Sequence, residues 1–159
     1  MDSGGVLVVN LAKGRLGEDA TALFGALLLS TLARIGLERA DQPEHERRDF
    51  AVYCDEVQIF ATLGVANMFA ELRKYAVHVV VGHQYLAQLE PDVRNAILGN
   101  VGTLIAFRVG PADAKTLATM LDFDLEPAEL IRLPNHHAFV RLLVDGHPMP
   151  AFSAEALRL

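Results

Sequence analysis

Two adjacent carboxylates follow a short apolar run in the stretch FAVYCDEVQIF, where Asp55 and Glu56 come directly after the residues FAVYC. In nucleotide hydrolases, an aspartate in this position holds the water shell of Mg²⁺, and the next glutamate polarises the attacking water. Apolar runs that end in acids are also common as capped strand ends without any catalytic role. The pair therefore indicates hydrolytic chemistry only if other parts of a nucleotide site accompany it.

A nucleotide hydrolase also needs a phosphate-binding loop of the pattern G-x-x-x-x-G-K-[ST]. The chain contains three lysines, Lys13, Lys74 and Lys115, and none of them stands in this pattern. The nearest match, GPADAKT, is one residue short and lacks the glycine before Lys115. We interpret it as the start of a helix, where Asp113 is favourable to the helix dipole. We therefore expect no phosphate-binding loop in this chain.

Polar residues also follow two later apolar runs. Gln84 ends the stretch VVVGHQ, and its amide can donate a hydrogen bond to a phosphate and accept one from a water. Arg108 ends the stretch LIAFR, where its guanidinium could pair with a carboxylate such as Asp55 or reach the nucleotide of a neighbouring subunit. The residues themselves leave these two alternatives open. We interpret His83 as a polar loop residue.

The apolar runs predict the elements that would position these side chains. Continuous runs rich in Val and Ile are typical of strands buried on both faces. Such runs occur at residues 6–11, broken only by Asn10, and at 50–54, 77–81 and 103–107. The segments between them have helical spacing, with Leu23, Leu27 and Ile35 in the first, or open with proline. We expect helices over residues 18–39, 68–75, 91–98, 111–121 and 127–131, and a last strand over 137–144 followed by an Asp145-Gly146 turn.

This alternation predicts an α/β fold with a mostly parallel sheet and helices on both faces. The polar residues that follow the strands would then share the carboxyl edge of the sheet, where such folds bind ligands. A length of 159 residues suits a single domain, residues 1–159.

Composition narrows the class of protein. The formal net charge of −6 excludes attraction of nucleic acid by the whole surface, so any contact with DNA must be local. The single cysteine, Cys54, excludes an internal disulfide, and the chain does not start with a signal peptide. The apolar stretch 20–33 is too short to span a membrane. We therefore expect a cytoplasmic protein with no membrane segment.

Two basic pairs, Lys13 with Arg15 and Arg73 with Lys74, could face DNA or a subunit boundary. A glycine-rich turn and a solvated helix end explain them at least as well. The adjacent His136 and His137 would point to opposite faces of a strand, which argues against a shared metal ion. We therefore assign no nucleic-acid-binding residue.

Five ordered blocks within residues 5–152 carry a family resemblance. They are VLVVNLAKGRLGEDA, FAVYCDEVQIFAT, ELRKYAVHVVVGHQYLAQL, VRNAILGNVGTLIAFRVGPADA and LPNHHAFVRLLVDG. Together they resemble the C-terminal half of the motor domain of HerA/FtsK-like ATPases, and most closely the conjugative coupling-protein branch (TraD/TraG-like) of type IV secretion. The resemblance implies a RecA-like P-loop NTPase core that lacks its Walker A part.

The resemblance also implies roles and partners. Asp55 and Glu56 match the Walker B acids, with Asp55 holding Mg²⁺ through water, Gln84 matches the polar sensor, and Arg108 matches the arginine finger. These families form hexameric rings that use ATP to move DNA. The resemblance therefore implies ATP, Mg²⁺, DNA, self-association and secretion machinery as ligands and partners. Without a Walker A loop, we do not expect ATP or Mg²⁺ to bind tightly to this chain alone, and whether it is an enzyme stays open.

Several explanations of the missing loop remain. The chain could be a piece of a longer motor protein, which we favour, or a shortened relative that has lost hydrolysis. A non-catalytic α/β module that docks on a partner is the main alternative function. A small enzyme that uses Asp55 and Glu56 as a bare metal pair is the second alternative.

Overall fold

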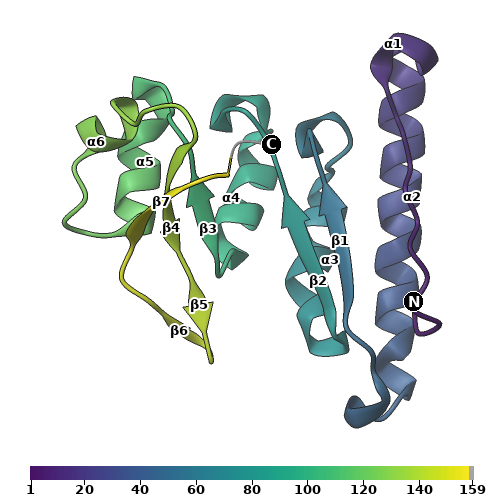
Figure 1. The fold of residues 1–159 in the computed structure, drawn as a ribbon. Coiled ribbons are helices and arrows are strands. Elements are labelled where there is room, and N and C mark those ends of the chain that lie inside the picture. The colour runs from purple at the N-terminus through teal and green to yellow at the C-terminus, as the bar shows by residue number, and fades with distance from the viewer. Residues whose placement is uncertain (158–159) are drawn as a thin grey trace. The chain divides into compact units, whose positions relative to one another are not determined.

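The structure, a computed structural model, describes residues 1–157. The chain, for which the sequence indicates a single domain, divides into two compact units, Met1–Gly99 and Asn100–Leu159, and each is described here by itself (Figure 1). The first unit contains α1 (Lys13–Leu16), α2 (Glu18–Glu38), β1 (Phe50–Cys54), α3 (Leu63–Leu72), β2 (Val77–Val81) and most of α4 (Pro91–Asn100). The second contains β3 (Leu104–Ala106), α5 (Pro111–Leu121), α6 (Pro127–Ile131), β4 (His137–Arg141), β5 (Leu143–Val144), β6 (His147–Pro148) and β7 (Phe152–Glu155).

In the first unit, β1 and β2 form a two-stranded parallel sheet, as the apolar runs predict. Their register places Phe50 opposite Val77 and Cys54 opposite Val81. Alternate residues of β1 face the core, so Val52 and Cys54 are buried whereas Tyr53 is 77% exposed. Burial raises the pKa of the Cys54 thiol to about 11, which fits a small hydrophobic core residue.

The predicted sheet of mostly parallel strands is wrong in its extent. Residues 6–11 are extended but belong to no strand, and Val6 and Val8 are 91% and 86% exposed. The run at 103–107 forms β3, which pairs antiparallel with β4 in a separate sheet. Hydropathy reports the tendency of a segment to be buried, but it specifies neither the partner strand nor its direction. This is why a similar pattern gives two paired parallel strands, one antiparallel strand and one unpaired segment.

The prediction of helices on both sheet faces is also wrong for the β1–β2 sheet. Its inward face packs on a core shared by α2, α3 and α4, which contains Leu29, Ala33, Val65, Leu72 and Val93. Its outward face leaves Tyr53 77% and Val80 49% exposed. One face of this parallel sheet is therefore open to solvent, whereas parallel sheets are usually covered on both faces.

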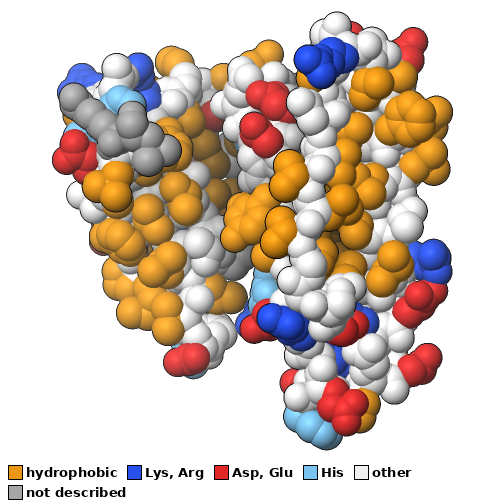
Figure 2. Space-filling view, turned by 45° about the vertical axis from the view of Figure 1, so that its right-hand side comes forward, with side chains coloured by type: hydrophobic (Ala, Val, Ile, Leu, Met, Phe, Trp, Pro, Cys, Tyr) orange, Lys and Arg blue, Asp and Glu red, His pale blue; other side chains and the backbone are white. Residues whose placement is uncertain are grey.

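Helix α2 runs over nearly the predicted range but buries a different stripe from the expected one. Leu23 and Leu27 are 59% and 56% exposed, while the buried positions are Thr21, Gly25, Leu29, Ala33 and Gly36. Small residues occupy the buried face of α2 because they let the helix approach its neighbours closely. A Cβ on Gly25 would lie 2.6 Å from the Phe60 ring, which is closer than real side chains come. The space-filling view shows hydrophobic side chains gathered on the surface where α2 and the N-terminal segment lie (Figure 2).

The helical stretch Glu18–Asp41, with a mean hydropathy of 1.7, is long and apolar enough to cross a membrane by length and composition alone. The sequence-based prediction that the apolar stretch of residues 20–33 is too short to span a membrane is therefore wrong about the length of the segment. The helix that contains this stretch continues without a break to Glu38. Core helices of soluble proteins meet the same criterion. In this structure, one side of α2 packs on α3 and the core around Ala33.

Arg39, at the end of α2, joins the helix to the chain that enters both strands. Its side chain is buried and donates hydrogen bonds to the carbonyl oxygens of Tyr75 at 2.7 Å and of Arg48. It also pairs with Asp2 Oδ1 at 2.7 Å. Desolvation alone would raise the pKa of Asp2, but the hydrogen bond and charge of Arg39 outweigh it and lower that pKa. Arg39 thus holds together the start of the chain, the end of α2 and the entry to the sheet.

The second unit is built on an antiparallel sheet in the order β3-β4-β7. Leu104 lies opposite Arg141, and His137 lies opposite Glu155. The predicted last strand, residues 137–144, is divided into β4 and β5. The predicted Asp145-Gly146 turn is confirmed, with φ of 50° and 81°, and joins β5 to β6.

We expect Gly25→Ala to lower the free energy of unfolding of the first unit by about 1–3 kcal/mol, because the new methyl group collides with the Phe60 ring. The ordinary preference of helices for alanine over glycine would act in the opposite direction. Urea unfolding followed by tyrosine fluorescence checks this, because Tyr53, Tyr75 and Tyr85 all lie in the first unit and the chain has no tryptophan. Gly99→Ala, in α4 with nothing within 4 Å, is the matched control and should be neutral or slightly stabilising. Equal effects of the two substitutions would contradict the packing of α2 on Phe60.

Candidate functional site

The chain turns sharply where β1 ends, and this turn positions the acidic pair. The amide of Gly82 donates to Cys54 O at 2.8 Å, and the amide of Val57 donates back to Gly82 O at 3.0 Å. These bonds continue the β1–β2 pairing beyond the last strand residues. Between them, Glu56 adopts a left-handed backbone conformation with φ of 52°, which is uncommon for a residue with a side chain. The turn brings residues 55 and 56 to the carboxyl end of β2.

The Asp55 carboxylate lies against the backbone of Gly82. Its Oδ1 accepts a hydrogen bond from the amide of Glu56 at 3.0 Å. A Cβ on residue 82 would lie 3.1 Å from the same oxygen, so glycine at this position allows the two strand ends to approach closely. Asp55 is exposed and so remains open to water and to ligands.

The Glu56 carboxylate is held by two glutamine side chains. Gln84 Nε2 donates to Glu56 Oε1 at 2.7 Å, and Gln58 Nε2 donates to Oε2. The pKa of Glu56 is lowered, and the hydrogen bond from Gln84 is the largest cause, followed by the one from Gln58. Partial burial acts in the opposite direction and raises the pKa, while the charge of Lys13 lowers it further. Glu56 is therefore ionised and only weakly basic. Such a carboxylate can orient and polarise a water more readily than it can remove a proton.

The structure thus brings together three of the four candidate residues, Asp55, Glu56 and Gln84. It adds Gln58, to which the sequence analysis gave no role beside the acids, while Lys13 acts on Glu56 through its charge. Gln58 stands two residues after Glu56, and an amide so close to an acid at a strand end is a usable sequence signal. Lys13 lies 43 residues before Glu56 in the chain, and no spacing rule links the two.

Arg108, the fourth candidate, belongs to the second unit. Its guanidinium donates to Leu133 O at 3.4 Å and to Asn135 Oδ1 at 2.8 Å. It lines an open cleft of about 320 Å³ together with Phe107, Pro134, Asn135 and His136. Its hydrogen bonds are to groups of its own unit, so the pairing with Asp55 that the sequence left open has no support from these contacts.

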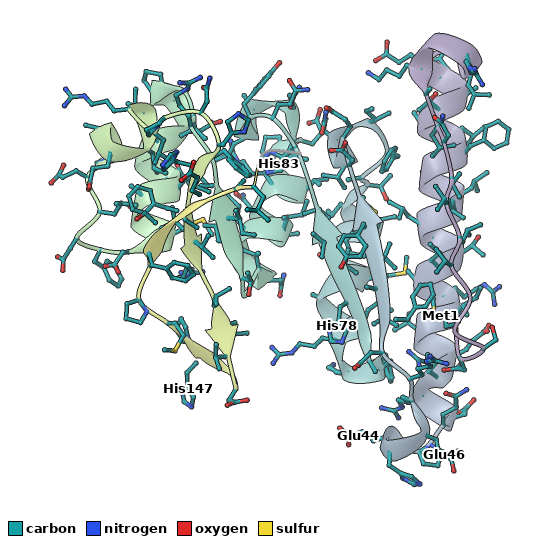
Figure 3. All side chains as sticks on the ribbon, in the orientation of Figure 1. Met1, Glu44, Glu46, His78, His83 and His147 are labelled. Atoms are coloured by element: carbon teal, nitrogen blue, oxygen red, sulfur yellow. The ribbon has the colours of Figure 1, made fainter. Side chains whose placement is uncertain are left out.

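Two histidines of β2 and its exit loop do not take part in the carboxylate contacts. His83 lies at the carboxyl end of β2, and its Nδ1 is buried without a hydrogen-bond partner among residues 1–157 (Figure 3). His78 lies at the opposite end of the strand, where its Nε2 is 3.1 Å from Asp49 Oδ1. Within the described part of the chain, no group of three or more His, Cys, Asp or Glu side chains is arranged to hold a metal ion.

We expect Gln84→Leu to raise the pKa of Glu56, because the substitution removes the hydrogen bond that most favours the ionised carboxylate. Carbon-13 NMR titration of the glutamate carboxyl groups measures this pKa directly. The lowered pKa stabilises the folded state above the ordinary pH of glutamate ionisation, and this contribution is lost as the pH falls through the folded-state value. The variant should lose part of that dependence. Gln42→Leu, which removes a glutamine remote from Glu56, should leave the pKa unchanged, and a Glu56 pKa unaffected by Gln84→Leu would refute the contact.

Comparisons with known proteins bear on the fold. No protein-family model and no curated protein matches the chain. Among solved structures, it is similar to the bacterial conjugative coupling protein TrwBdeltaN70 in its unbound monoclinic form, with a TM-score of 0.60 and 19% identity. The trigonal form of the same protein in complex with sulphate gives a TM-score of 0.57 and 22% identity. Each match covers 79% of this chain and 35% of the other, so most of this mixed α/β chain resembles about a third of TrwBdeltaN70 in fold.

Proposed function

We propose that this chain is part of the motor of an ATP-dependent DNA translocase of the conjugative coupling-protein type. One observation carries the proposal: Gln84, from the end of β2, donates a hydrogen bond of 2.7 Å to Glu56, from the end of β1. An acid and an amide thus meet at the carboxyl edge of a parallel sheet, which is where α/β folds bind their ligands. The fold likeness to TrwBdeltaN70 supports the same assignment.

Asp55 would hold Mg²⁺ through water in this motor. Mg²⁺ keeps several water ligands and takes one or two carboxylates together with substrate phosphates. An exposed Asp55, with one oxygen fixed by a backbone amide, fits this requirement without a cluster of protein ligands. When bound, the ion would neutralise charge on the phosphates.

Glu56 and Gln84 would together orient and polarise the attacking water. The ionised Glu56 polarises the water, and its low basicity suits orientation of that water rather than early removal of its proton. The NH₂ group of Gln84 can donate to a γ-phosphate in place of Glu56. Its carbonyl oxygen can accept a hydrogen bond from the water, because an amide has both a donor and an acceptor.

Arg108 would act on the nucleotide of a neighbouring subunit. It is exposed and lines an open cleft, and its hydrogen bonds to Leu133 O and Asn135 Oδ1 fix the guanidinium beside that cleft. A planar guanidinium held in this way suits bidentate contact with phosphate oxygens.

Self-association, DNA and secretion machinery are the partners we propose, with a cytoplasmic location or, for a full-length protein, the cytoplasmic face of the inner membrane. The exposed side chains of Val6, Val8, Tyr53 and Val80 support an association surface on the first unit. The same open sheet face favours the second candidate function, a non-catalytic module that docks on a protein partner.

We expect the chain of residues 1–159 with Mg²⁺ and ATP to show only background hydrolysis, because its sequence has no G-x-x-x-x-G-K-[ST] loop. A reading frame that encodes such a loop upstream should yield a protein with DNA-dependent ATPase activity. In that protein, Glu56→Gln should lower the rate by about 10²–10⁴-fold. The matched control is Glu44→Gln, because Glu44 is exposed and remote from the carboxyl ends of β1 and β2 (Figure 3). A reading frame without the loop would contradict the proposal that this chain carries only part of the nucleotide site. Hydrolysis by the 159-residue chain that Glu56→Gln abolishes would contradict it too.

A further inference from the structure

The turn that leads into β4 holds a histidine in a costly backbone conformation. The amide of His137 donates to Pro134 O at 3.3 Å and closes a turn over residues 134–137. His136, the third residue of this turn, has a φ of 66°, where glycine or asparagine is favoured. The amide of Ala156, just after β7, donates to His136 O at 2.7 Å and helps to fix the turn. Residues kept in such conformations gather at functional sites, so the side chain of His136 is the group to account for.

The side chains next to His136 already have hydrogen-bond partners. Asn135 Oδ1 accepts a hydrogen bond from the Arg108 guanidinium at 2.8 Å, and His137 Nδ1 lies 3.1 Å from Asn135 O. The imidazole of His136 is exposed and makes no hydrogen bond within residues 1–157. Of the two adjacent histidines, His136 is therefore the one that is available to a ligand.

The antiparallel pairing of β3 with β4 brings His136 to the same edge as Arg108. Ala106, the last residue of β3, lies opposite Phe139 of β4, so the chain that leaves β3 runs beside the chain that enters β4. These two segments line one open cleft, whose residues are Phe107, Arg108, Pro134, Asn135 and His136. None of the five is a carboxylate, so an anion meets no like charge in the lining.

The donors in this cleft suit a phosphate group. Arg108 uses two of its donors on Leu133 O and Asn135 Oδ1, and a guanidinium carries five. An imidazole can donate a ring N–H in its neutral form as well as in its protonated form. A strand of nucleic acid is bound along an extended positive groove, whereas this lining offers one permanent cation. A short polyphosphate chain therefore fits the cleft better than a nucleic-acid backbone does.

We propose that His136 and Arg108 together form a phosphate-binding site, in which the guanidinium supplies the charge and the imidazole supplies a second hydrogen bond. The assignment of that phosphate to a nucleotide rests on the proposed function of Arg108. The site itself rests on the cleft and its hydrogen bonds within the second unit. It also accounts for the histidine at a position where glycine would relax the turn, because glycine would remove the donor.

Calorimetric titration of the 159-residue chain with sodium tripolyphosphate, without magnesium, tests this site, and NMR of the His136 imidazole follows the contact. His136→Gly should weaken binding by about 3- to 10-fold, the loss of one hydrogen bond to a charged group at an exposed site. The same variant should keep or raise the thermal unfolding midpoint, because glycine accepts the positive φ. Arg108→Gln should weaken binding by about 10-fold or more.

Two matched controls lie in the second unit outside the cleft. His147→Gln removes an exposed histidine of β6, and Lys115→Gln removes an exposed positive charge of α5 (Figure 3). Both variants should bind tripolyphosphate as the unaltered chain does. Equal losses in His136→Gly and His147→Gln would overturn the site, as would an unaltered chain that does not bind tripolyphosphate or a His136 signal that does not respond to it.

Further outcomes separate this inference from the proposed function. Binding that Arg108→Gln weakens and His136→Gly leaves intact would overturn the role of His136 and retain that of Arg108. Binding that both substitutions weaken, with ATP bound more tightly than single-stranded oligothymidine, would support the site and its assignment to a nucleotide. Tighter binding of the oligothymidine, weakened by both substitutions, would support the phosphate site and overturn its assignment to a nucleotide.

Discussion

The register of β1 against β2 is the constraint on which the rest of the site depends. With Cys54 opposite Val81, the next residues of both strands emerge at one edge, and the bonds of Gly82 with Cys54 and Val57 carry the pairing into the turn. Glu56 is thereby placed within reach of Gln84, 28 residues further along the chain. A slip by one residue would point every side chain of one strand to the other face. The contact between carboxylate and amide would be lost along with the core.

Packing behind the sheet keeps this edge in place. Val57, the first residue after the turn, is fully buried, and Phe60 closes the same short helical turn against Gly25 of α2. The absence of a side chain on Gly25 therefore matters to residues whose chemistry lies elsewhere. Support comes from one side only, since the outward sheet face around Tyr53 remains open.

Electrostatics gives the two acids different characters although they are adjacent. Asp55 is fixed by a backbone amide and stays accessible, which suits a ligand of metal-bound water. Glu56 accepts hydrogen bonds from the side-chain amides of Gln84 and Gln58, and these bonds and the charge of Lys13 lower its pKa. The carboxylate therefore stays ionised and is weakly basic. The same environment that lowers its proton affinity leaves it able to orient a water. The two adjacent carboxylates thus have different environments, which the hydrogen bonds around each of them create.

The sequence by itself determined the elements that local signals specify: the two central strands, the proline-initiated helices α5 and α6, the Asp145-Gly146 turn, and the position of Asp55 and Glu56 after a strand. Polar residues at strand ends also identified Gln84 correctly as a neighbour of Glu56. Only the tertiary structure decided that residues 6–11 stay unpaired, that β3 runs antiparallel to β4, and that α2 buries Gly25 rather than Leu23. It also showed that the charge of Lys13 contributes to the lowered pKa of Glu56. Strand partners, buried helix faces and contacts between distant residues depend on which surfaces meet in the folded chain, and hydropathy along the sequence does not contain that information.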